Sequence, residues 1–320
     1  MLRSFFVGLS KAAWAQRLVT SWGFARRAAR RFVAGETSAE AVEAVRQLNA
    51  HGINASLDHL GENTATQEDG LASSAEILAL LERIQSSGVR ANVSIKLSQI
   101  GLGLDEEFCR AQLGAILAKA KSLGLFVRID MEDSSLTGST LKQYFWALED
   151  GFNDQVGIVL QAYLYRTVQD LTAVLERGGR VRLCKGAYKE LEAVAFPRIA
   201  DVDLNFDQLA LQLLRGGQKN GAALISADGR IPPLPAIATH DPKRIDFVRR
   251  AVRELSLPHA AVEFQMLYGI RRDLQAELAA DGFPVRVYVP YGTHWYPYFM
   301  RRLGERPANI WFFISNFFRH

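Results

Sequence analysis

The chain has 320 residues, of which 48% are hydrophobic and 22% are charged, an ordinary composition for a soluble globular protein. No apolar run approaches the ~18 residues of a membrane-spanning helix. The only two cysteines, Cys109 and Cys184, exclude a disulfide framework and favour a reducing compartment. The length fits one (β/α)8 barrel of about 250 residues with extra helices.

The basic character of the chain lies at its N-terminus. The net charge is +4, but residues 1–35 hold seven basic residues and no acid, which leaves 31 basic and 34 acidic residues in the rest. A nucleic-acid enzyme would more often place its basic residues around the working cleft, so we expect no nucleic-acid partner. Apolar residues at helical spacing predict an amphipathic helix; they are Leu2, Phe5, Phe6, Leu9 and Ala13. It is open whether this helix is a membrane-surface anchor, a transit peptide, a basic arm or a packing helix with a solvated face.

Short β-rich runs alternate with helical stretches after an N-terminal helical segment at residues 1–50. The predicted strands are Ile53–Leu57, Asn92–Leu97, Phe126–Met131, Gly157–Gln161, Val181–Cys184, Ala236–Thr239, Ala261–Gln265 and Val285–Val289. The predicted helices are Ser74–Ser86, Glu106–Lys121, Leu141–Gly151, Thr167–Gly178, Leu204–Asn220, Pro242–Leu255 and Arg271–Asp281. Glycines suited to the position after a helix stand at Gly88, Gly124, Gly178, Gly221 and Gly282.

This alternation predicts an α/β fold, a (β/α)8 TIM-like barrel with extra N-terminal helices, whose catalytic domain spans residues 51–320. An open doubly wound sheet is the alternative. It would usually show a G-x-G-x-x-G turn after an early strand, and the chain contains none. The connection from Gly186 to Pro235 is longer than the others, and we expect an extra helix or loop there.

Polar residues end every predicted strand, at the rim where barrels of this class build their active sites. These strand ends are Asp58–His59, Lys96, Asp130, Gln161, Lys185, Thr239–His240, Gln265 and Tyr288. We expect Lys96, Arg182 and Lys185 to face Asp130, which suits an anionic or zwitterionic ligand. The chain has no HExxH motif, no Cys/His cluster and no phosphate-binding glycine loop, so we predict no metal site.

After the last strand, Tyr298, Arg301, Arg302 and Glu305 are three and four residues apart and share one helical face. Adjacent arginines can bind a carboxylate bidentately, with Glu305 holding one of them. A solvated surface pair is the alternative. Aromatic residues nearby favour a wall around a small apolar ring; they are Tyr288, Tyr291, Trp295, Tyr296 and Tyr298.

Six segments, in order, resemble the proline dehydrogenase family, from about Asp58 to Asn309. They are VSIKLS around Lys96, RIDMEDS around Asp130, RVRLCKGAY (Arg180–Tyr188), ATHD (Ala238–Asp241), EFQMLYG (Glu263–Gly269) and VYVPYGTHWYPYFMRRLGERPAN (Val287–Asn309). The likeness is to the short monofunctional bacterial form. It implies a distorted barrel that binds FAD non-covalently. It also implies oxidation of L-proline to Δ1-pyrroline-5-carboxylate, the first step of proline catabolism to glutamate, with electrons passed to a membrane quinone.

The resemblance also implies roles for residues. Lys96, Arg301 and Arg302 would grip the proline carboxylate, Tyr288 and Tyr298 would pack around its ring, and Glu305 would pair with the arginines. The residues expected to hold the flavin are Asp130, Gln161, Arg182, Lys185, Gly186, Ala187, Thr239 and His240, with Arg182 near the flavin N5. Asp130, Arg182 and Tyr188 are the expected catalytic residues, and Tyr188 and Leu267 would close the pocket. We interpret Cys184 as a buried packing residue.

Three alternatives stay open at this point. One is a Schiff-base aldolase that uses Lys96 or Lys185, and another is a different flavin barrel such as a folate reductase. The third is a basic membrane- or nucleic-acid-associated module driven by residues 1–35. We expect a cytoplasmic enzyme with peripheral contact at the inner face of the cell membrane, made by the basic helix and the C-terminal aromatics. Those aromatics are Trp311, Phe312, Phe313, Phe317 and Phe318.

Overall fold

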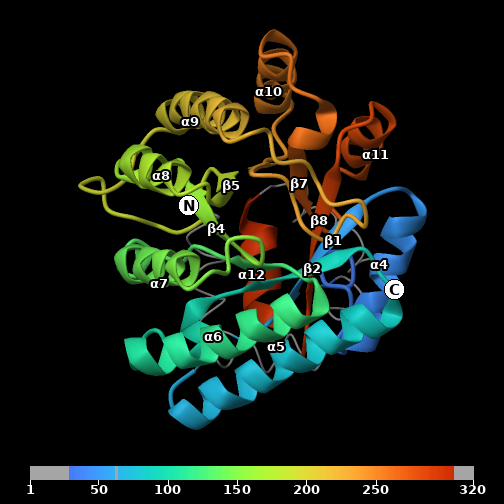
Figure 1. Cartoon of the computed structure of the whole chain (residues 1–320), viewed down its shortest axis with the longest axis vertical. Coiled ribbons are helices and arrows are strands. Elements are labelled where there is room, and N and C mark those ends of the chain that lie inside the picture. Colours follow the sequence, from blue (N-terminus) through green and yellow to red (C-terminus); the bar gives the residue numbers. More distant parts are fainter. Residues whose placement is uncertain (1–28, 62–63, 306–320) are drawn as a thin grey trace.

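The computed structural model of the chain describes residues 29–61 and 64–305 (Figure 1). Eight parallel strands follow one another in chain order around a closed barrel, which confirms the predicted fold. They are β1 (Asn54–His59), β2 (Ala91–Ile95), β3 (Val127–Ile129), β4 (Val156–Gln161), β5 (Arg180–Cys184), β6 (Pro235–Ala238), β7 (Glu263–Leu267) and β8 (Val285–Tyr291). The barrel closes where β1 pairs with β8, with Leu57 opposite Val289.

Helices surround the strands, except that α12 lies over one end of the barrel (Figure 1). The helices are α4 (Ser38–Ala50), α5 (Gln67–Ser87), α6 (Glu106–Leu123), α7 (Thr137–Glu149), α8 (Thr167–Glu176), α9 (Ile199–Lys219), α10 (Pro242–Glu254), α11 (Arg272–Ala280) and α12 (Trp295–Glu305), with short 3-10 turns η1 (Leu97–Ile100) and η2 (His259–Ala261). The five glycines predicted to follow helices all have positive φ, from 63° to 83°. The long connection after β5 contains α9, as expected.

Two element boundaries differ from the prediction for local reasons. Helix α5 begins at Gln67 instead of Ser74, because Thr66 and Asp69 form a capping box that starts the helix earlier. Strand β7 begins at Glu263 instead of Ala261, because the preceding residues form the turn η2. Gln265 therefore lies inside the barrel, and Leu267 takes its predicted place at the strand end.

The two faces of the barrel wall differ in polarity. Side chains alternate along a strand, and Leu57, Val93 and Val127 are fully buried apolar residues of the wall. Their polar neighbours Ser56 and Ser94 contact Arg182 across the barrel lumen. Barrels of this class commonly fill the lumen with branched apolar side chains, whereas this lumen is largely polar.

A buried ion pair fills the base of the lumen. Arg286 and Glu263 are fully buried and form two parallel hydrogen bonds, of 2.8 Å from Nε and 3.0 Å from Nη2. The guanidinium also donates to the carbonyls of Ala55 at 2.7 Å and Gly229 at 2.6 Å. A buried charge is tolerated when its hydrogen-bonding groups are satisfied in this way.

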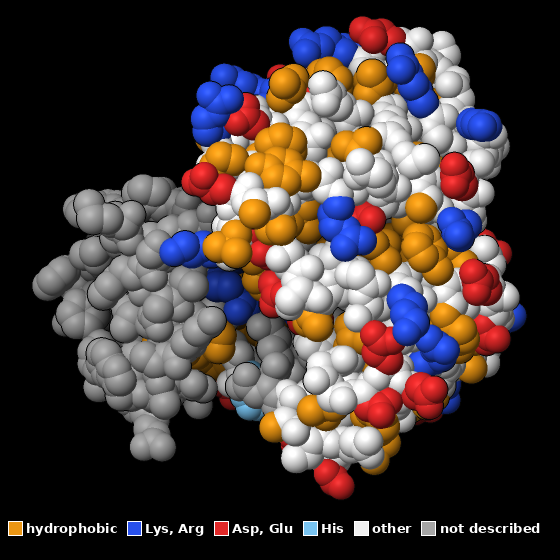
Figure 2. All heavy atoms as spheres, turned by 90° about the vertical axis from the view of Figure 1, so that its left-hand side faces the viewer, with side chains coloured by type: hydrophobic (Ala, Val, Ile, Leu, Met, Phe, Trp, Pro, Cys, Tyr) orange, Lys and Arg blue, Asp and Glu red, His pale blue; other side chains and the backbone are white. Residues whose placement is uncertain are grey.

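The N-terminal part of the described chain packs on the barrel, because α4 contributes Ala41, Val42 and Val45 to the main hydrophobic core. A domain boundary at residue 50 stays a prediction. The amphipathic helix expected at residues 2–13 and the aromatics at 311–318 lie outside the described residues. None of the helices described here combines the length and the apolar character needed to cross a bilayer. On the face in Figure 2, basic and acidic side chains are interspersed and do not form one basic patch.

We expect Glu263→Ala to lower the free energy of unfolding by about 3–5 kcal/mol, because it leaves the buried Arg286 without its carboxylate. Chemical denaturation followed by circular dichroism measures this change. The matched control is Glu43→Ala, which breaks an exposed pair with Arg46 and should cost less than about 1 kcal/mol. Equal effects of the two substitutions would contradict the role given to the ion pair.

Candidate active site

A cavity of about 440 Å³ opens at the carboxyl ends of the strands, beneath α12. Its volume is in the range of small-molecule and cofactor sites. The cavity is lined by the predicted substrate, flavin and pocket-closing residues; these are Lys96, Asp130, Gln161, Arg182, Lys185, Gly186, Ala187, Tyr188, Thr239, His240, Leu267, Tyr288, Tyr298, Arg301 and Arg302. The side chain of Glu305 lies outside the described residues, and its predicted pairing with the arginines stays a prediction.

The Arg182 guanidinium lies at the floor of this cavity. Its Nη1 donates to Asp130 Oδ1 at 2.8 Å and to Ser94 Oγ at 3.1 Å. Its Nε donates to Gln265 Oε1 at 2.5 Å, and its Nη2 donates to Ser56 Oγ at 3.3 Å. These partners come from β1, β2, β7 and the residue after β3, so the strands around the lumen fix one buried cation.

Both carboxylate oxygens of Asp130 are engaged. Oδ1 accepts from Arg182, and Oδ2 accepts from the Tyr288 hydroxyl at 2.7 Å. Burial, together with the negative charges of Asp130 and Asp58, raises the pKa of Tyr288 well above its ordinary value. The phenol therefore keeps its proton and remains a donor. This geometry favours a role for Asp130 in orienting Arg182 and Tyr288. It is less suited to a role as a direct proton acceptor.

The three cations expected to face Asp130 have different partners. Arg182 pairs with Asp130, whereas Lys96 pairs with Asp58, with 3.2 Å between Lys96 Nζ and Asp58 Oδ2. The Lys96 and Asp58 side chains are both nearly inaccessible. Asp58 was recognised from sequence only as a polar strand end, and the long separation from Lys96 hides their pairing.

On the opposite side of the cavity, Lys185 lies between two carboxylates. Its Nζ is 2.5 Å from Asp203 Oδ1 and 2.8 Å from Asp241 Oδ2. Burial raises the pKa of Asp241, but the hydrogen bond and charge of Lys185 outweigh it, so the pKa lies below its ordinary value. His240 is fixed nearby, because its Nε2 accepts from the Leu267 backbone N–H at 2.9 Å. Asp203 belongs to α9, and nothing in its sequence context marked it as a site residue.

Helix α12 brings Tyr298, Arg301 and Arg302 to the cavity, as their spacing predicted. The Arg302 guanidinium carbon lies 5.1 Å from the centre of the Tyr298 ring. Of the five aromatics expected to wall a small ring, Tyr288 and Tyr298 line the cavity. The other three do not; Tyr291 packs in the barrel core, and Trp295 and Tyr296 pack in a separate apolar cluster with Phe32 and Phe299, a cluster that Tyr298 also joins.

Cavity-lining residues without a predicted role are mostly small or apolar: Met131, Val159, Cys184, Ala238 and Met266. Cys184 is half-buried and borders the cavity. It also packs against the main hydrophobic core, which agrees with its interpretation as a packing residue. Burial raises the pKa of its thiol to about 12. The thiol therefore stays protonated, in agreement with the expectation that it is not a redox group.

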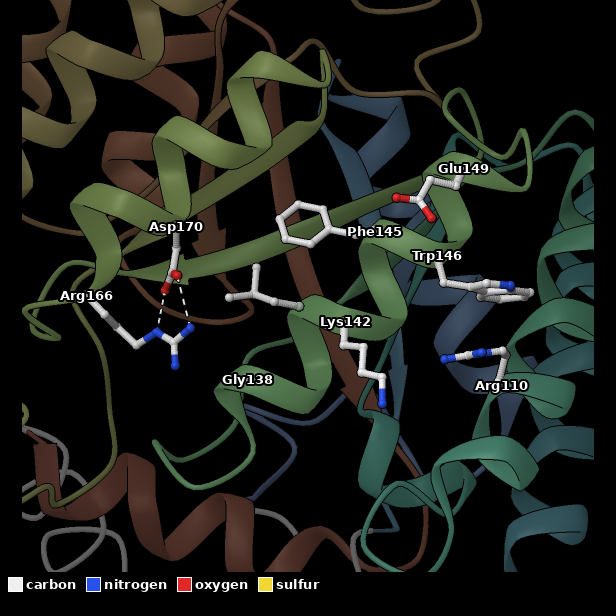
Figure 3. Close-up of a pocket in the computed structure, with 9 residues that line it drawn as sticks. Arg110, Gly138, Lys142, Phe145, Trp146, Glu149, Arg166 and Asp170 are labelled. Atoms are coloured by element: carbon white, nitrogen blue, oxygen red, sulfur yellow. Dashed lines mark hydrogen bonds and ion pairs between the residues drawn. The ribbon is translucent and has the colours of Figure 1, made fainter.

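A second hollow, a groove of about 510 Å³, lies on the outer face of α7 and α8 (Figure 3). Phe145 and Trp146 contribute apolar surface, and Arg166 pairs with Asp170 across 2.7 Å. Lys142 pairs with Glu106. The groove shares no lining residue with the cavity, and its paired charges are typical of a solvated surface. In the part of the chain that the structure describes, no group of three or more His, Cys, Asp or Glu residues could hold a metal.

Comparisons with known proteins agree with this geometry. A sequence model described as proline dehydrogenase matches residues 41–313. Proline dehydrogenase 1 of Bacillus subtilis (strain 168) is 41% identical over 316 residues, which cover 98% of each chain. The proline dehydrogenase of Deinococcus radiodurans is 40% identical over 290 residues, 90% of this chain and 89% of that one.

Solved structures of proline utilization A share the fold. The protein from Bdellovibrio bacteriovorus, inactivated by N-propargylglycine, superposes with a TM-score of 0.78 and 24% identity, over 87% of this chain and 32% of that one. A structure with proline bound in remote sites gives a TM-score of 0.70 and 26% identity, over 89% and 31%. This chain thus spans about a third of each of those proteins. The family match and the near full-length relatives show that the chain belongs to the proline dehydrogenase family, oxidoreductases that act on CH–NH groups.

Proposed function

We propose that the chain is an FAD-dependent proline dehydrogenase, which oxidises L-proline to Δ1-pyrroline-5-carboxylate and passes the electrons to a membrane quinone. The observation that carries this proposal is the single cavity that holds Arg182 at its floor and Arg301 and Arg302 at its cover. An aldolase would need a lysine with a depressed pKa and an unpaired amine. Lys96 and Lys185 are instead each paired with carboxylates.

The lining of the cavity fits a flavin. Gln161 Oε1 is buried without a hydrogen-bond partner among the described residues, and a buried acceptor of this kind calls for a donor from a ligand. Lys185, Gly186 and Ala187 form the neighbouring wall. Gly186 has φ +110°, a conformation that favours glycine. When bound, the flavin would accept a hydride from the carbon next to the ring nitrogen, and the protein would position and polarise the reactants.

The substrate carboxylate would bind beneath α12. Arg301 and Arg302 border the cavity there, and Lys96 borders it from the end of β2. Guanidinium groups suit a planar carboxylate, and a clamped carboxylate fixes the orientation of the rest of the molecule. Tyr288 and Tyr298 present aromatic rings to the same space, which suits an apolar five-membered ring.

The role proposed for Arg182 is electrostatic. Its side chain is nearly inaccessible, and four side-chain acceptors hold the guanidinium in place. A cation that is already oriented stabilises developing negative charge without reorganisation. Tyr188 would help to close the cavity from the loop after β5.

We expect Arg302→Ala to raise the KM for proline about ten- to a hundredfold, because a charge-assisted contact with the carboxylate is lost. The flavin content should stay unchanged. Steady-state kinetics and the flavin-to-protein absorbance ratio measure the two quantities. Arg272→Ala, an exposed arginine of α11, serves as the control and should change neither. Loss of flavin from the Arg302 variant would count against the assignment.

Arg182→Met should lower the reduction potential of the bound flavin by on the order of 30 mV, since a missing cation disfavours the reduced anion. Anaerobic dye-coupled titration gives the potential. Arg166→Met removes a surface cation from the outer groove and should leave the potential unchanged. A potential that did not move in the Arg182 variant would remove this role.

Peripheral contact with the inner face of the cell membrane is part of the proposal, since the basic segment at residues 1–35 suits anionic lipid. Flotation with anionic liposomes should carry the full chain upward and leave a chain without residues 1–35 behind. Neutral liposomes should bind both weakly. Equal flotation of the two chains on anionic liposomes would remove the segment from the proposal.

A further inference from the structure

The loop after β5 wraps around Tyr163, the second residue after β4. The Tyr163 N–H donates to the Lys185 carbonyl at 2.9 Å, and its carbonyl accepts from the Phe196 N–H at 2.8 Å. Gly186 packs against the ring so closely that a Cβ there would lie 2.2 Å from it. Tyr163 therefore supports the bend of the cavity-lining segment Lys185–Tyr188.

Glu190, later in the same loop, joins it by hydrogen bonds to the loop after β3. Its Oε1 accepts from the Ser134 backbone N–H at 2.8 Å, and its Oε2 accepts from Ser134 Oγ at 2.5 Å. The Tyr163 hydroxyl also donates to Oε1 at 3.3 Å. Ser134 lies four residues after Asp130, in the loop between β3 and α7. One carboxylate thus accepts three hydrogen bonds from the loops after β3 and β4.

The donors are suited to this arrangement. Burial, and next the negative charge of Glu190, raises the pKa of the Tyr163 phenol, so the hydroxyl keeps its proton. Hydrogen bonds to an ionised acceptor are shorter and stronger than those between neutral groups. Glu190 itself does not border the cavity, so any effect on a ligand there would be indirect.

We call a glutamate whose two carboxylate oxygens accept from the backbone N–H and the hydroxyl of one serine a glutamate–serine bracket. A second such bracket is formed by Glu132 and Ser98. Glu132 Oε1 accepts from the Ser98 backbone N–H at 3.1 Å, and its Oε2 accepts from Ser98 Oγ at 2.5 Å. This pair joins the segment after β2 to the segment after β3. Two glutamate–serine brackets therefore tie together the segments after β2, β3 and β5, which supply Lys96, Asp130 and Lys185 to the cavity.

We propose that Glu190 is a positioning residue, a latch that holds the wall Lys185–Tyr188 against the loop after β3 in the conformation that receives the cofactor. The inference rests on the proposed function, because that wall is the one assigned to the flavin. By contrast, the structural role of the latch, which is to join the two loops, rests only on the hydrogen bonds.

The test compares Glu190→Ala with Glu192→Ala, a loss of the same charge two residues away at an exposed position. Amide hydrogen exchange of segments 131–136 and 185–196 reports the latch, and titration of the apoprotein with FAD reports the dissociation constant. In Glu190→Ala we expect the amide exchange rates of both segments and the FAD dissociation constant each to rise about ten- to a hundredfold. Glu192→Ala should resemble the unmodified protein in both.

The outcomes separate the two proposals. If Glu190→Ala changed exchange and FAD affinity no more than Glu192→Ala, the latch would be overturned. A chain that bound no FAD, yet exchanged faster in Glu190→Ala, would overturn the proposed function and support the latch. Should Glu190→Ala not fold, Ser134→Ala removes one donor from the same bracket. That variant must then speed exchange in segment 185–196, and unchanged exchange there would overturn the latch.

Discussion

The structure depends on a buried cation, the Arg182 guanidinium inside the barrel. A charge removed from water is tolerated only where hydrogen bonds and opposite charge replace its hydration. Here Ser56, Ser94, Asp130 and Gln265 supply the acceptors from separate strands. Closing the barrel in the correct register is therefore the condition for satisfying Arg182, and a slip of one residue would turn these polar groups away from it.

This requirement extends to the base of the lumen. Gln265, which accepts from Arg182, also donates to Glu263 Oε1 at 2.5 Å, and Glu263 pairs with Arg286. A continuous polar column thus links the base of the barrel to Asp130 and the cavity. Cohesion comes mainly from the outer face of the strands, where apolar side chains pack beneath the helices. The inner face instead carries polar and charged side chains. The groups proposed to act on the flavin and the substrate therefore lie on a rigid support.

Periodicity and turn residues were sufficient to predict the eight strands and the glycines after the helices. Except for His59, the predicted rim residues also line one cavity, because the carboxyl ends of parallel strands meet at one end of a barrel. Alternation alone did not indicate which face would be the lumen. Glu263 and Arg286 therefore went unrecognised, although both are fully buried. Gln265 was predicted at the end of its strand because the turn before β7 was read as strand; it lies two residues before that end and still lines the cavity.

The sequence also did not predict the ion pairs and hydrogen bonds that join segments far apart in the chain. Lys96 meets Asp58 from 38 residues away, and Glu190 meets Ser134 from 56 residues away. Such contacts depend on the register of neighbouring strands and on the path of the loops at the rim, which the periodicity of a single sequence does not specify. The same holds for α12, whose arginines were predicted from their spacing, whereas Trp295 and Tyr296 do not line the cavity and pack with Tyr298 in an apolar cluster.

An anaerobic absorption spectrum can show whether one cavity holds a flavin beside a site for proline. We expect the purified chain, supplied with FAD, to show flavin absorption bands that bleach when L-proline is added without oxygen. Methylenetetrahydrofolate should leave those bands unchanged. A protein that takes up no FAD, or whose flavin responds to the folate and not to proline, would overturn the proposed function.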